Sequence, residues 1–145
     1  MRNVAPLDEE IVKHFTCQIV DAVVYIHSQN IIHLDIKGDN ILLTPDGICK
    51  LCDFGLARRI KAPLKQSLIG TIQFMPPEVI NVPEGGYGLP ADVWSVGCTV
   101  VEMVGRELSF CGIDLGAILF KVGMFKTHPK IPDEASEDCV KFLDR

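Results

Sequence analysis

The sequence has no long hydrophobic run, and no apolar stretch approaches the ~18 residues that span a bilayer. Its first eight residues, MRNVAPLD, include nothing like the apolar core of a signal peptide. Positive charge is not in excess, because 14 lysines and arginines stand against 19 acids and give a net charge of -5. Nucleic acids and anionic membranes are polyanions and are not attracted to such a surface. We therefore expect a soluble, cytoplasmic protein that binds neither nucleic acid nor membrane.

The cysteines do not indicate a disulfide framework or a metal site. All six lie scattered in apolar segments, which is typical of free thiols in a reducing compartment. Cys49 and Cys52 match a C-x-x-C pattern, but no second pair or nearby histidine completes a zinc site. We interpret them as packed thiols, with a zinc or redox role as the alternative.

Internal repeats and low-complexity segments are also absent, and what remains indicates a mainly α domain. The chain has 145 residues, 48% of them apolar, which is enough for one core. Apolar residues at helical spacing predict a helix over residues 8–28. Residues 91–104 are apolar nearly all round and predict a buried central helix. Weaker helices are predicted over 115–122 and 136–143, the second capped by Asp133 or Ser136.

Only one β element is predicted. Residues 41–44 and 48–51 are short apolar runs on either side of Pro45-Asp46-Gly47, a pattern that predicts a small hairpin. Residues 53–80 are punctuated by glycine and proline and predict a long loop that ends in a short helix. Loops of this length are usually functional or disordered.

The richest chemistry flanks this hairpin. His33-Leu34-Asp35-Ile36-Lys37-Gly38-Asp39-Asn40 precedes it, and Asp53-Phe54-Gly55 follows it, so the hairpin brings the two motifs together. Phosphoryl transfer needs a carboxylate that accepts the proton of the attacking hydroxyl, a cation near the γ-phosphate and oxygen ligands for Mg²⁺. Asp35, Lys37, Asn40 and Asp53 form such a set.

These motifs resemble the catalytic loop and the D-F-G signature of the protein kinases. The resemblance implies the large, C-terminal lobe of the kinase fold without its N-terminal β lobe. It divides residues 1–145, a partial kinase domain, into a catalytic loop (33–40), an activation segment (53–78), a core helix (90–104) and C-terminal helices (114–144). ATP and Mg²⁺ are the implied cofactors.

By the same resemblance each motif residue receives a role. Asp35 is the catalytic base and Lys37 contacts the γ-phosphate. Asn40 and Asp53 bind Mg²⁺, and with Lys37 they form the ATP site that Leu42 completes against the adenine. The supporting residues of the catalytic loop and activation segment are His33, Phe54, Gly55, Ser67, Thr71, Glu78 and Asp92.

Two of the supporting residues have a plain structural interpretation as well. Asp92 follows Pro90 and would favour a helix N-terminus through the helix dipole, whereas in kinases an acid there braces the catalytic loop. His33 is expected to be a buried, hydrogen-bonded support and not a proton carrier. Thr71 is expected to bind near Asp35.

The segment Phe120-Lys121-Val122-Gly123-Met124-Phe125-Lys126 is similar to the mitogen-activated protein kinase kinase kinases, of the apoptosis signal-regulating and MEKK type. The implied substrate is a serine or threonine of a mitogen-activated protein kinase kinase. The oligomeric state is left open.

The chain departs from the kinase pattern in several places. Leu34 replaces the usual arginine, so phosphate on Ser67 or Thr71 is not expected to order the loop in the usual way. Phe74 and Pro76 replace the usual tyrosine and alanine, and the link after Val104 is short, so substrate docking is expected to differ. Glu78 is expected to pair with an arginine beyond Arg145.

Nothing before Asp8 supplies a glycine-rich loop or a strand lysine, so this polypeptide alone is expected to have little phosphotransferase activity. Two functions stay open. One is a serine/threonine protein kinase present as a partial domain, and the other is a non-catalytic binding module that acts through the helices near residues 110–126. A plain helical structural domain would require the motif order to be accidental.

Overall fold

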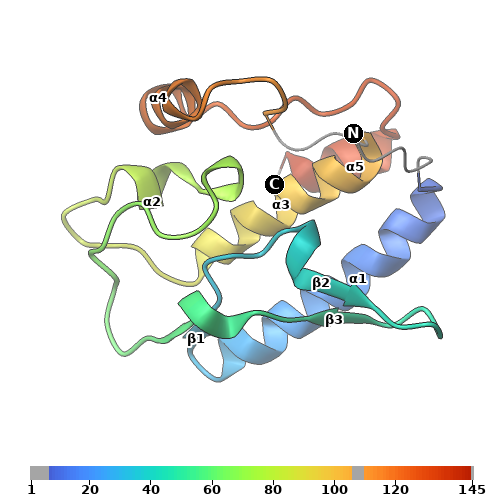
Figure 1. Ribbon diagram of the computed structural model, residues 1–145, viewed down its shortest axis with the longest axis horizontal. Coiled ribbons are helices and arrows are strands. Elements are labelled where there is room, and N and C mark those ends of the chain that lie inside the picture. Colours follow the sequence, from blue (N-terminus) through green and yellow to red (C-terminus); the bar gives the residue numbers. More distant parts are fainter. Residues whose placement is uncertain (1–6, 106–109, 145) are drawn as a thin grey trace.

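Two helices form the centre of the molecule. The computed structural model describes residues 7–105 and 110–144, and in it α1 (Glu9–Ser28) lies beside α3 (Pro90–Gly105) (Figure 1). Asp8 caps α1 by accepting a hydrogen bond from the backbone N–H of Glu10, and acids occupy the first turn, where the helix dipole favours them. Both predicted helices are confirmed.

The main core lies between these helices and the catalytic loop. Ile36 of that loop is completely buried there against apolar side chains of α1 and α3, namely Val12, Ile19, Val23, Val96 and Val100. Burying side chains of this size stabilises by about 1.5–3 kcal/mol each. The catalytic loop is therefore anchored in the main core through Ile36.

The predicted hairpin is present as β2 (Ile41–Leu43) and β3 (Cys49–Leu51), paired antiparallel with Ile41 opposite Leu51. Gly47 has a positive φ of 83° in the turn, a conformation that glycine adopts at no steric cost. The hairpin is attached to α1 because the side-chain oxygen of Gln18 accepts a hydrogen bond from the N–H of Cys49, at 2.8 Å.

A second sheet was not predicted. The strands β1 (Ile31–Ile32) and β4 (Arg58–Arg59) pair antiparallel, with Ile31 opposite Arg59. Two residues are too short to show an alternating pattern, and the partners are far apart in the chain. This pairing ties the start of the long loop to the segment before the catalytic loop.

The rest of the long loop forms the 3-10 helices η2 (Phe54–Leu56) and η3 (Ile72–Phe74), followed by α2 (Pro77–Ile80), the short helix that was predicted. Apolar side chains of the loop pack around Leu34 in a second cluster with Ile32, Met75, Val79, Tyr87 and Ala91. Leu64 and Tyr87 also pair as an isolated β-bridge. The loop is thus packed onto the core.

The C-terminal helices are α4 (Leu115–Phe125) and α5 (Glu137–Leu143). Ser136 caps α5, whereas Asp133 does not. The predicted end of α4 at Val122 was wrong, because the helix continues through Gly123 and ends where Lys126 adopts a left-handed conformation. Its N-cap, Asp114, was also missed.

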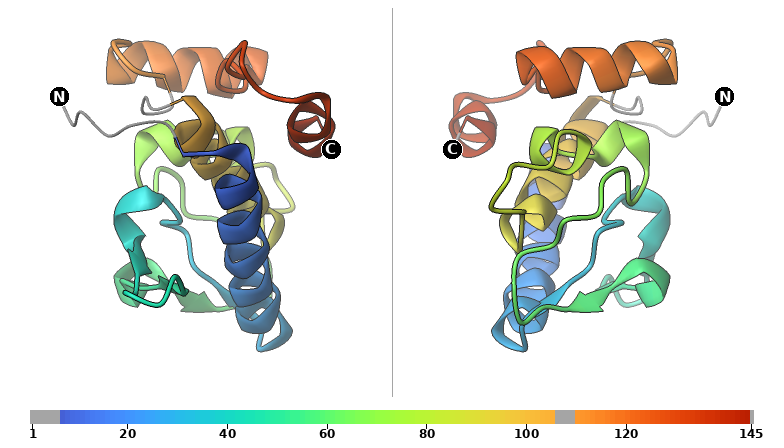
Figure 2. Two further views of the ribbon diagram at one scale, coloured as in Figure 1. Left: turned by 90° about the vertical axis from the view of Figure 1, so that its right-hand side faces the viewer. Right: turned by 90° about the vertical axis from the view of Figure 1, so that its left-hand side faces the viewer.

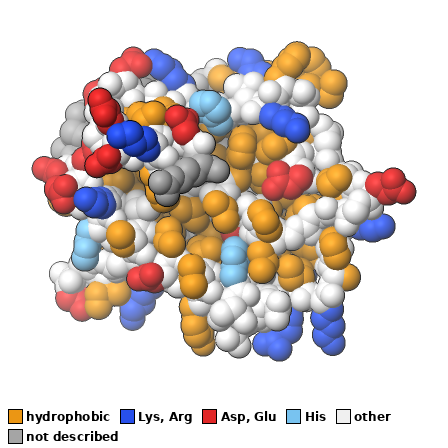
Figure 3. Space-filling model, turned by 180° about the vertical axis from the view of Figure 1, so that it is seen from behind, with side chains coloured by type: hydrophobic (Ala, Val, Ile, Leu, Met, Phe, Trp, Pro, Cys, Tyr) orange, Lys and Arg blue, Asp and Glu red, His pale blue; other side chains and the backbone are white. Residues whose placement is uncertain are grey.

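Figure 2 shows α4 lying across one end of the molecule, whereas α5 lies beside α3 in Figure 1. The face that is turned away from the viewer in Figure 1 carries an apolar groove of about 620 Å³ between α1, α3, α5 and residues 128–131. It is visible as hydrophobic side chains across the middle of Figure 3.

Some expectations fall on segments that the structure does not describe. The signal-peptide expectation rests largely on residues 1–6, and the short link after Val104 includes residues 106–109; both lie outside the described residues. Within residues 7–105 and 110–144, no helix is both long and apolar enough to cross a bilayer.

Candidate active site

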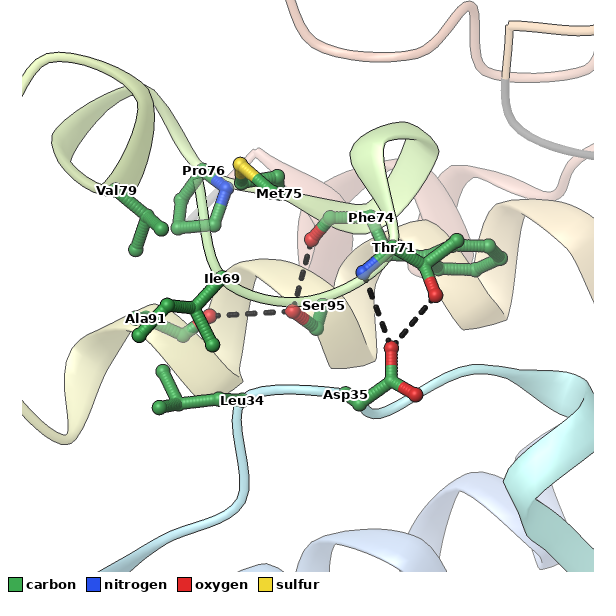
Figure 4. Close-up of a pocket in the computed structure, with 10 residues that line it drawn as sticks. All are labelled: Leu34, Asp35, Ile69, Thr71, Phe74, Met75, Pro76, Val79, Ala91 and Ser95. Atoms are coloured by element: carbon green, nitrogen blue, oxygen red, sulfur yellow. Dashed lines mark hydrogen bonds between the residues drawn. The ribbon is translucent and has the colours of Figure 1, made fainter. Parts of the chain in front are cut away.

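Asp35 is the centre of the polar network on the catalytic loop. Its Oδ1 accepts hydrogen bonds from the hydroxyl of Thr71 at 2.6 Å and from the N–H of the same residue at 3.1 Å (Figure 4). Its Oδ2 accepts from Asn40 Nδ2 at 2.9 Å and lies 3.1 Å from Lys37 Nζ. Both carboxylate oxygens are therefore held in place by donors.

These donors determine how Asp35 titrates. Burial favours the neutral form, but hydrogen bonds from Thr71, Lys37 and Asn40 and the positive charge of Lys37 outweigh it, so the pKa of Asp35 lies below its ordinary value of 3.8. Asp35 is ionised at neutral pH and can orient a hydroxyl group by accepting its hydrogen bond.

Lys37 and Thr71 complete a small constellation around this carboxylate. Lys37 Nζ donates to the hydroxyl oxygen of Thr71 at 2.8 Å, so this hydroxyl lies between an anion and a cation. Gly70 makes the approach possible, because a Cβ at its position would collide with the carbonyl oxygen of Leu34 and its φ is +100°. The activation segment thus meets the catalytic loop at Thr71.

Asp92 holds the backbone of the catalytic loop from below. It is completely buried on α3, and its carboxylate accepts hydrogen bonds from the N–H groups of His33 at 2.8 Å and Leu34 at 2.9 Å. Leu34 has a φ of 69°, a left-handed conformation that costs a non-glycine residue about 1–3 kcal/mol. The hydrogen bonds that Asp92 accepts stabilise this strained turn directly before Asp35.

His27 also binds Asp92, a contact that was not predicted. Its Nε2 lies 2.8 Å from Asp92 Oδ2, which brings the last turn of α1 into the same network. This contact joins residues 65 positions apart, so no local pattern could reveal it. A buried polar side chain needs hydrogen-bond partners, and His27 adds a third partner for Asp92 to the two backbone N–H groups.

His33 connects the catalytic loop to the residue before Asp53. It is completely buried, and its Nε2 lies 3.1 Å from the carbonyl oxygen of Cys52. The ring of Phe54 packs edge-on against it with 4.8 Å between centroids. The backbone N–H of Cys52 in turn donates to the carbonyl oxygen of Asn40 at 2.9 Å. The hairpin therefore brings the two predicted motifs together.

The donor set at this junction fits a hard divalent cation such as Mg²⁺. Asn40 uses its Nδ2 to donate to the carbonyl and carboxylate oxygens of Asp35, which leaves its amide oxygen as a potential ligand. Asp53 has a left-handed backbone and an exposed side chain, and one carboxylate oxygen accepts from the N–H of Gly55. Carboxylate and amide oxygens are the ligands that Mg²⁺ prefers.

Three predicted residues lie away from this network. Leu42 is exposed on β2, and Ser67 is exposed in the loop before Thr71. Glu78 on α2 lines the apolar groove on the opposite face.

The model of the protein kinase domain family matches residues 1–145. The chain belongs to the protein kinase family. Over residues 7–105 and 110–144 its architecture, mainly helical with two small antiparallel sheets, is that of the large lobe of a kinase domain, as the motifs implied.

Curated relatives place the chain near one branch of this family. It is 44% identical over 142 residues to mitogen-activated protein kinase kinase kinase nsy-1 of Caenorhabditis elegans, with 95% of this chain and 10% of the relative covered. It is 42% identical to human mitogen-activated protein kinase kinase kinase 5, with 94% and 10% covered. A serine/threonine-protein kinase of Saccharomyces cerevisiae, BCK1/SLK1/SSP31, is 38% identical, with 92% and 9% covered. The chain thus spans about a tenth of the length of these relatives.

Proposed function

We propose that this chain is the catalytic-loop and activation-segment part of a serine/threonine protein kinase that uses ATP and Mg²⁺. The proposed substrate is a mitogen-activated protein kinase kinase, in a cytoplasmic signalling cascade, because several relatives are named as mitogen-activated protein kinase kinase kinases. In this proposal residues 33–40 are the catalytic loop, 53–78 the activation segment, 90–104 the core helix and 114–144 the C-terminal helices.

The observation that supports this proposal most directly is the position of the Thr71 hydroxyl. It donates to Asp35 and accepts from Lys37, so one threonine hydroxyl already occupies the environment that an attacking serine or threonine needs. In the proposed reaction Asp35 accepts the proton of the substrate hydroxyl. The hydroxyl oxygen of the substrate forms a bond to the γ-phosphorus of ATP, and the bond from that phosphorus to ADP breaks, so that ADP leaves. Lys37 offsets the negative charge beside that oxygen.

Asn40 and Asp53 are the residues that would hold Mg²⁺. When bound, the ion would neutralise phosphate charge, and a catalytic site with this function needs both ligands close to Asp35. The hydrogen bonds from Asn40 to Asp35 and from Cys52 to Asn40 support this assignment. Leu42 is proposed to contact the adenine from β2, where its exposed side chain offers an apolar surface.

Binding of Mn²⁺ and ATP to the isotope-labelled chain tests the proposal by NMR, since paramagnetic Mn²⁺ broadens the resonances of nearby nuclei. We expect ATP-dependent broadening at Asn40 and over residues 52–55, which Asn40→Ala and Asp53→Asn abolish. Asp21→Asn, at an exposed aspartate on α1, is the matched control for removal of a carboxylate and should leave the broadening unchanged.

The alternative function, a non-catalytic binding module, gives a different result. A module without nucleotide chemistry would show broadening only at scattered surface acids such as Glu137 and Asp138, and Asn40→Ala would not change it. The part of the chain that the structure describes has no glycine-rich loop or strand lysine over this site, so we expect phosphotransfer by this polypeptide alone to be slow.

A further inference from the structure

The outer side of α4 exposes large apolar side chains. Phe120, Met124 and Phe125 are 57%, 66% and 69% exposed, and the rings of the two phenylalanines meet edge-on with 5.4 Å between centroids. On a helix, residues four apart lie on the same side, so Phe120 and Met124 are neighbours. Clustered exposed apolar side chains commonly mark an interaction site.

Two lysines lie among these apolar side chains. Lys121 is one helical turn before Phe125, and Lys126 directly follows it. Neither lysine forms an ion pair with any residue that the structure describes. We call Phe120, Lys121, Met124, Phe125 and Lys126 the α4 patch.

The charge around the α4 patch is opposite in sign to that of the chain as a whole. Residues 113–130 contain three lysines and a single acid, Asp114, whereas the whole chain has a net charge of -5. Lys130 is paired with Asp133, so the unpaired positive charge is concentrated at the patch itself. In Figure 3, hydrophobic side chains gather at the upper right, with lysine or arginine side chains close by.

The helix that presents the α4 patch is firmly anchored. Ile118 and Val122 on its inner side are completely buried, and α4 packs against α2 and η3. Asn81 Nδ2 donates to the carbonyl oxygen of Gly123 at 2.8 Å, and a Cβ at Gly123 would lie 2.9 Å from that nitrogen. A partner therefore meets a preformed surface and does not have to order it.

We propose that the α4 patch docks a segment of another protein in which apolar side chains are flanked by aspartate or glutamate. The apolar side chains would cover the phenylalanines and Met124, and the acids would meet Lys121 and Lys126. Because α4 contacts η3, which begins just after Thr71, the docked protein would lie near the catalytic loop. The partner's identity as a protein substrate rests on the proposed function; the docking itself does not.

Fluorescence anisotropy with the purified chain and two synthetic peptides tests this assignment. The peptides share leucine and phenylalanine positions and differ only in their flanking residues, glutamate in one and lysine in the other. We expect the glutamate peptide to bind about tenfold more tightly, a difference of about 1.4 kcal/mol, and to weaken as ionic strength rises. The double variant Lys121→Glu/Lys126→Glu should reverse the preference.

Variants of the α4 patch are compared with matched control variants on α1. Phe125→Ala should weaken the glutamate peptide about fivefold or more, while Tyr25→Ala, at a position 68% exposed, should leave it unchanged. Lys13→Glu is the control for charge reversal. Circular dichroism of each variant separates loss of binding from loss of fold.

Three results would overturn the docking proposal: equal binding of both peptides, equal effects of the patch and control variants, or self-association of the chain that Phe125→Ala abolishes. The last result would assign the patch to a second copy of the chain. No part of this experiment needs ATP or phosphotransfer, so its failure would leave the proposed phosphoryl transfer untouched.

Discussion

At the scale of single residues, Asp92 joins three segments that are far apart in the sequence. It holds the backbone N–H groups of His33 and Leu34 and lies against His27. The sequence alone left two interpretations of Asp92, a helix N-terminal acid and a brace. It lies in the first turn of α3, yet its oxygens bind the catalytic loop, so the geometry favours the brace.

Asp92→Asn is expected to lower the free energy of unfolding by about 2–4 kcal/mol, because one carboxylate acceptor becomes an amide donor facing buried N–H groups. Urea unfolding followed by circular dichroism measures this loss. Asp21→Asn, at an exposed aspartate on α1, is the control and should change stability by less than about 0.5 kcal/mol. A loss that small for Asp92→Asn as well would contradict its role as a brace.

Thr71→Val is expected to change stability in a pH-dependent way. The pKa of Asp35 is lowered in the folded state, so its hydrogen bonds stabilise the fold above pH ~4, and this contribution is lost as pH falls through the folded pKa. Valine removes the hydroxyl donor and should raise the pKa of Asp35. The variant should lose about 1–3 kcal/mol at pH 7 and progressively less as the pH falls below 4.

Urea unfolding at several pH values and carboxyl NMR titration of Asp35 check this prediction. Thr127→Val, at an exposed threonine, is the control and should show no pH-dependent difference. If the loss caused by Thr71→Val were the same at every pH, the hydroxyl would not be acting on the Asp35 carboxylate.

At the scale of elements, the contact between α2 and α4 depends on a glycine. A Cβ at Gly123 would lie 2.9 Å from both Asn81 Nδ2 and Ile80 Cγ2, so Gly123→Ala should push the helices apart. Overpacking of this kind costs about 1–3 kcal/mol, more than the ~1 kcal/mol that alanine adds as a better helix former.

Gly97→Ala in α3 is the matched test, because the nearest atom to its added Cβ is Leu143 Cδ2 at an ordinary 3.9 Å. Thermal unfolding should show a lower Tm for Gly123→Ala and an unchanged or higher Tm for Gly97→Ala. The same sign of change in both variants would contradict the packing of α4 on α2.

The activation segment is held by apolar packing and backbone hydrogen bonds. Leu34 is buried among its apolar side chains, and the N–H of Leu68 donates to the carbonyl oxygen of Val79 at 3.1 Å. Leucine offers no cation to a phosphate, so a negative charge at Ser67 has no partner at that position.

We therefore predict that Ser67→Glu leaves amide hydrogen exchange over residues 64–79 unchanged, while Leu34→Ala accelerates it at least tenfold by removing about 2–4 kcal/mol of packing. Hydrogen exchange with mass spectrometry measures both. Slower exchange in Ser67→Glu would show that charge at this position orders the segment after all.

The elements that could be predicted are those whose sequence pattern is long or lies within one segment of the chain. The stripe of α1, the apolar surface of α3 and the turn of the β2–β3 hairpin each specify a structure within one segment. The β1–β4 pair could not be predicted, because each strand has two residues and its stability comes from a distant partner. The end of α4 was misjudged because Gly123 is retained for close packing against α2 and does not terminate the helix.

The same distinction applies to the candidate site. Asp35 and Asn40 are close in sequence, and the hairpin predicted that Asp53 would lie near them. The contact of Thr71 with Asp35 spans 36 positions and was expected only from the resemblance to the kinases. The contact of His27 with Asp92 spans 65 positions and is revealed only by the folded chain.

At the scale of the whole molecule, the polar network around Asp35 and the two apolar surfaces lie in different places. The network around Asp35 lies where the catalytic loop meets the activation segment, and the α4 patch lies at one end of the molecule. The apolar groove, whose lining includes Glu78 and Trp94, lies on the face that Figure 3 shows. Side chains of α1 and α3 line the groove, and both helices also pack against Ile36 of the catalytic loop. Substitutions in the groove should therefore lower the stability of the fold more than they change the chemistry at Asp35.

The most direct test of the central claim is phosphoryl transfer by a chimera that joins this chain to the small lobe of human mitogen-activated protein kinase kinase kinase 5. With radiolabelled ATP and Mg²⁺, we predict transfer to serine or threonine of a protein substrate, reduced about 10²–10⁴-fold by Asp35→Asn. A folded chimera that binds ATP but transfers no phosphate, or whose transfer is unaffected by Asp35→Asn, would contradict the assignment of this chain as the catalytic half of a serine/threonine kinase.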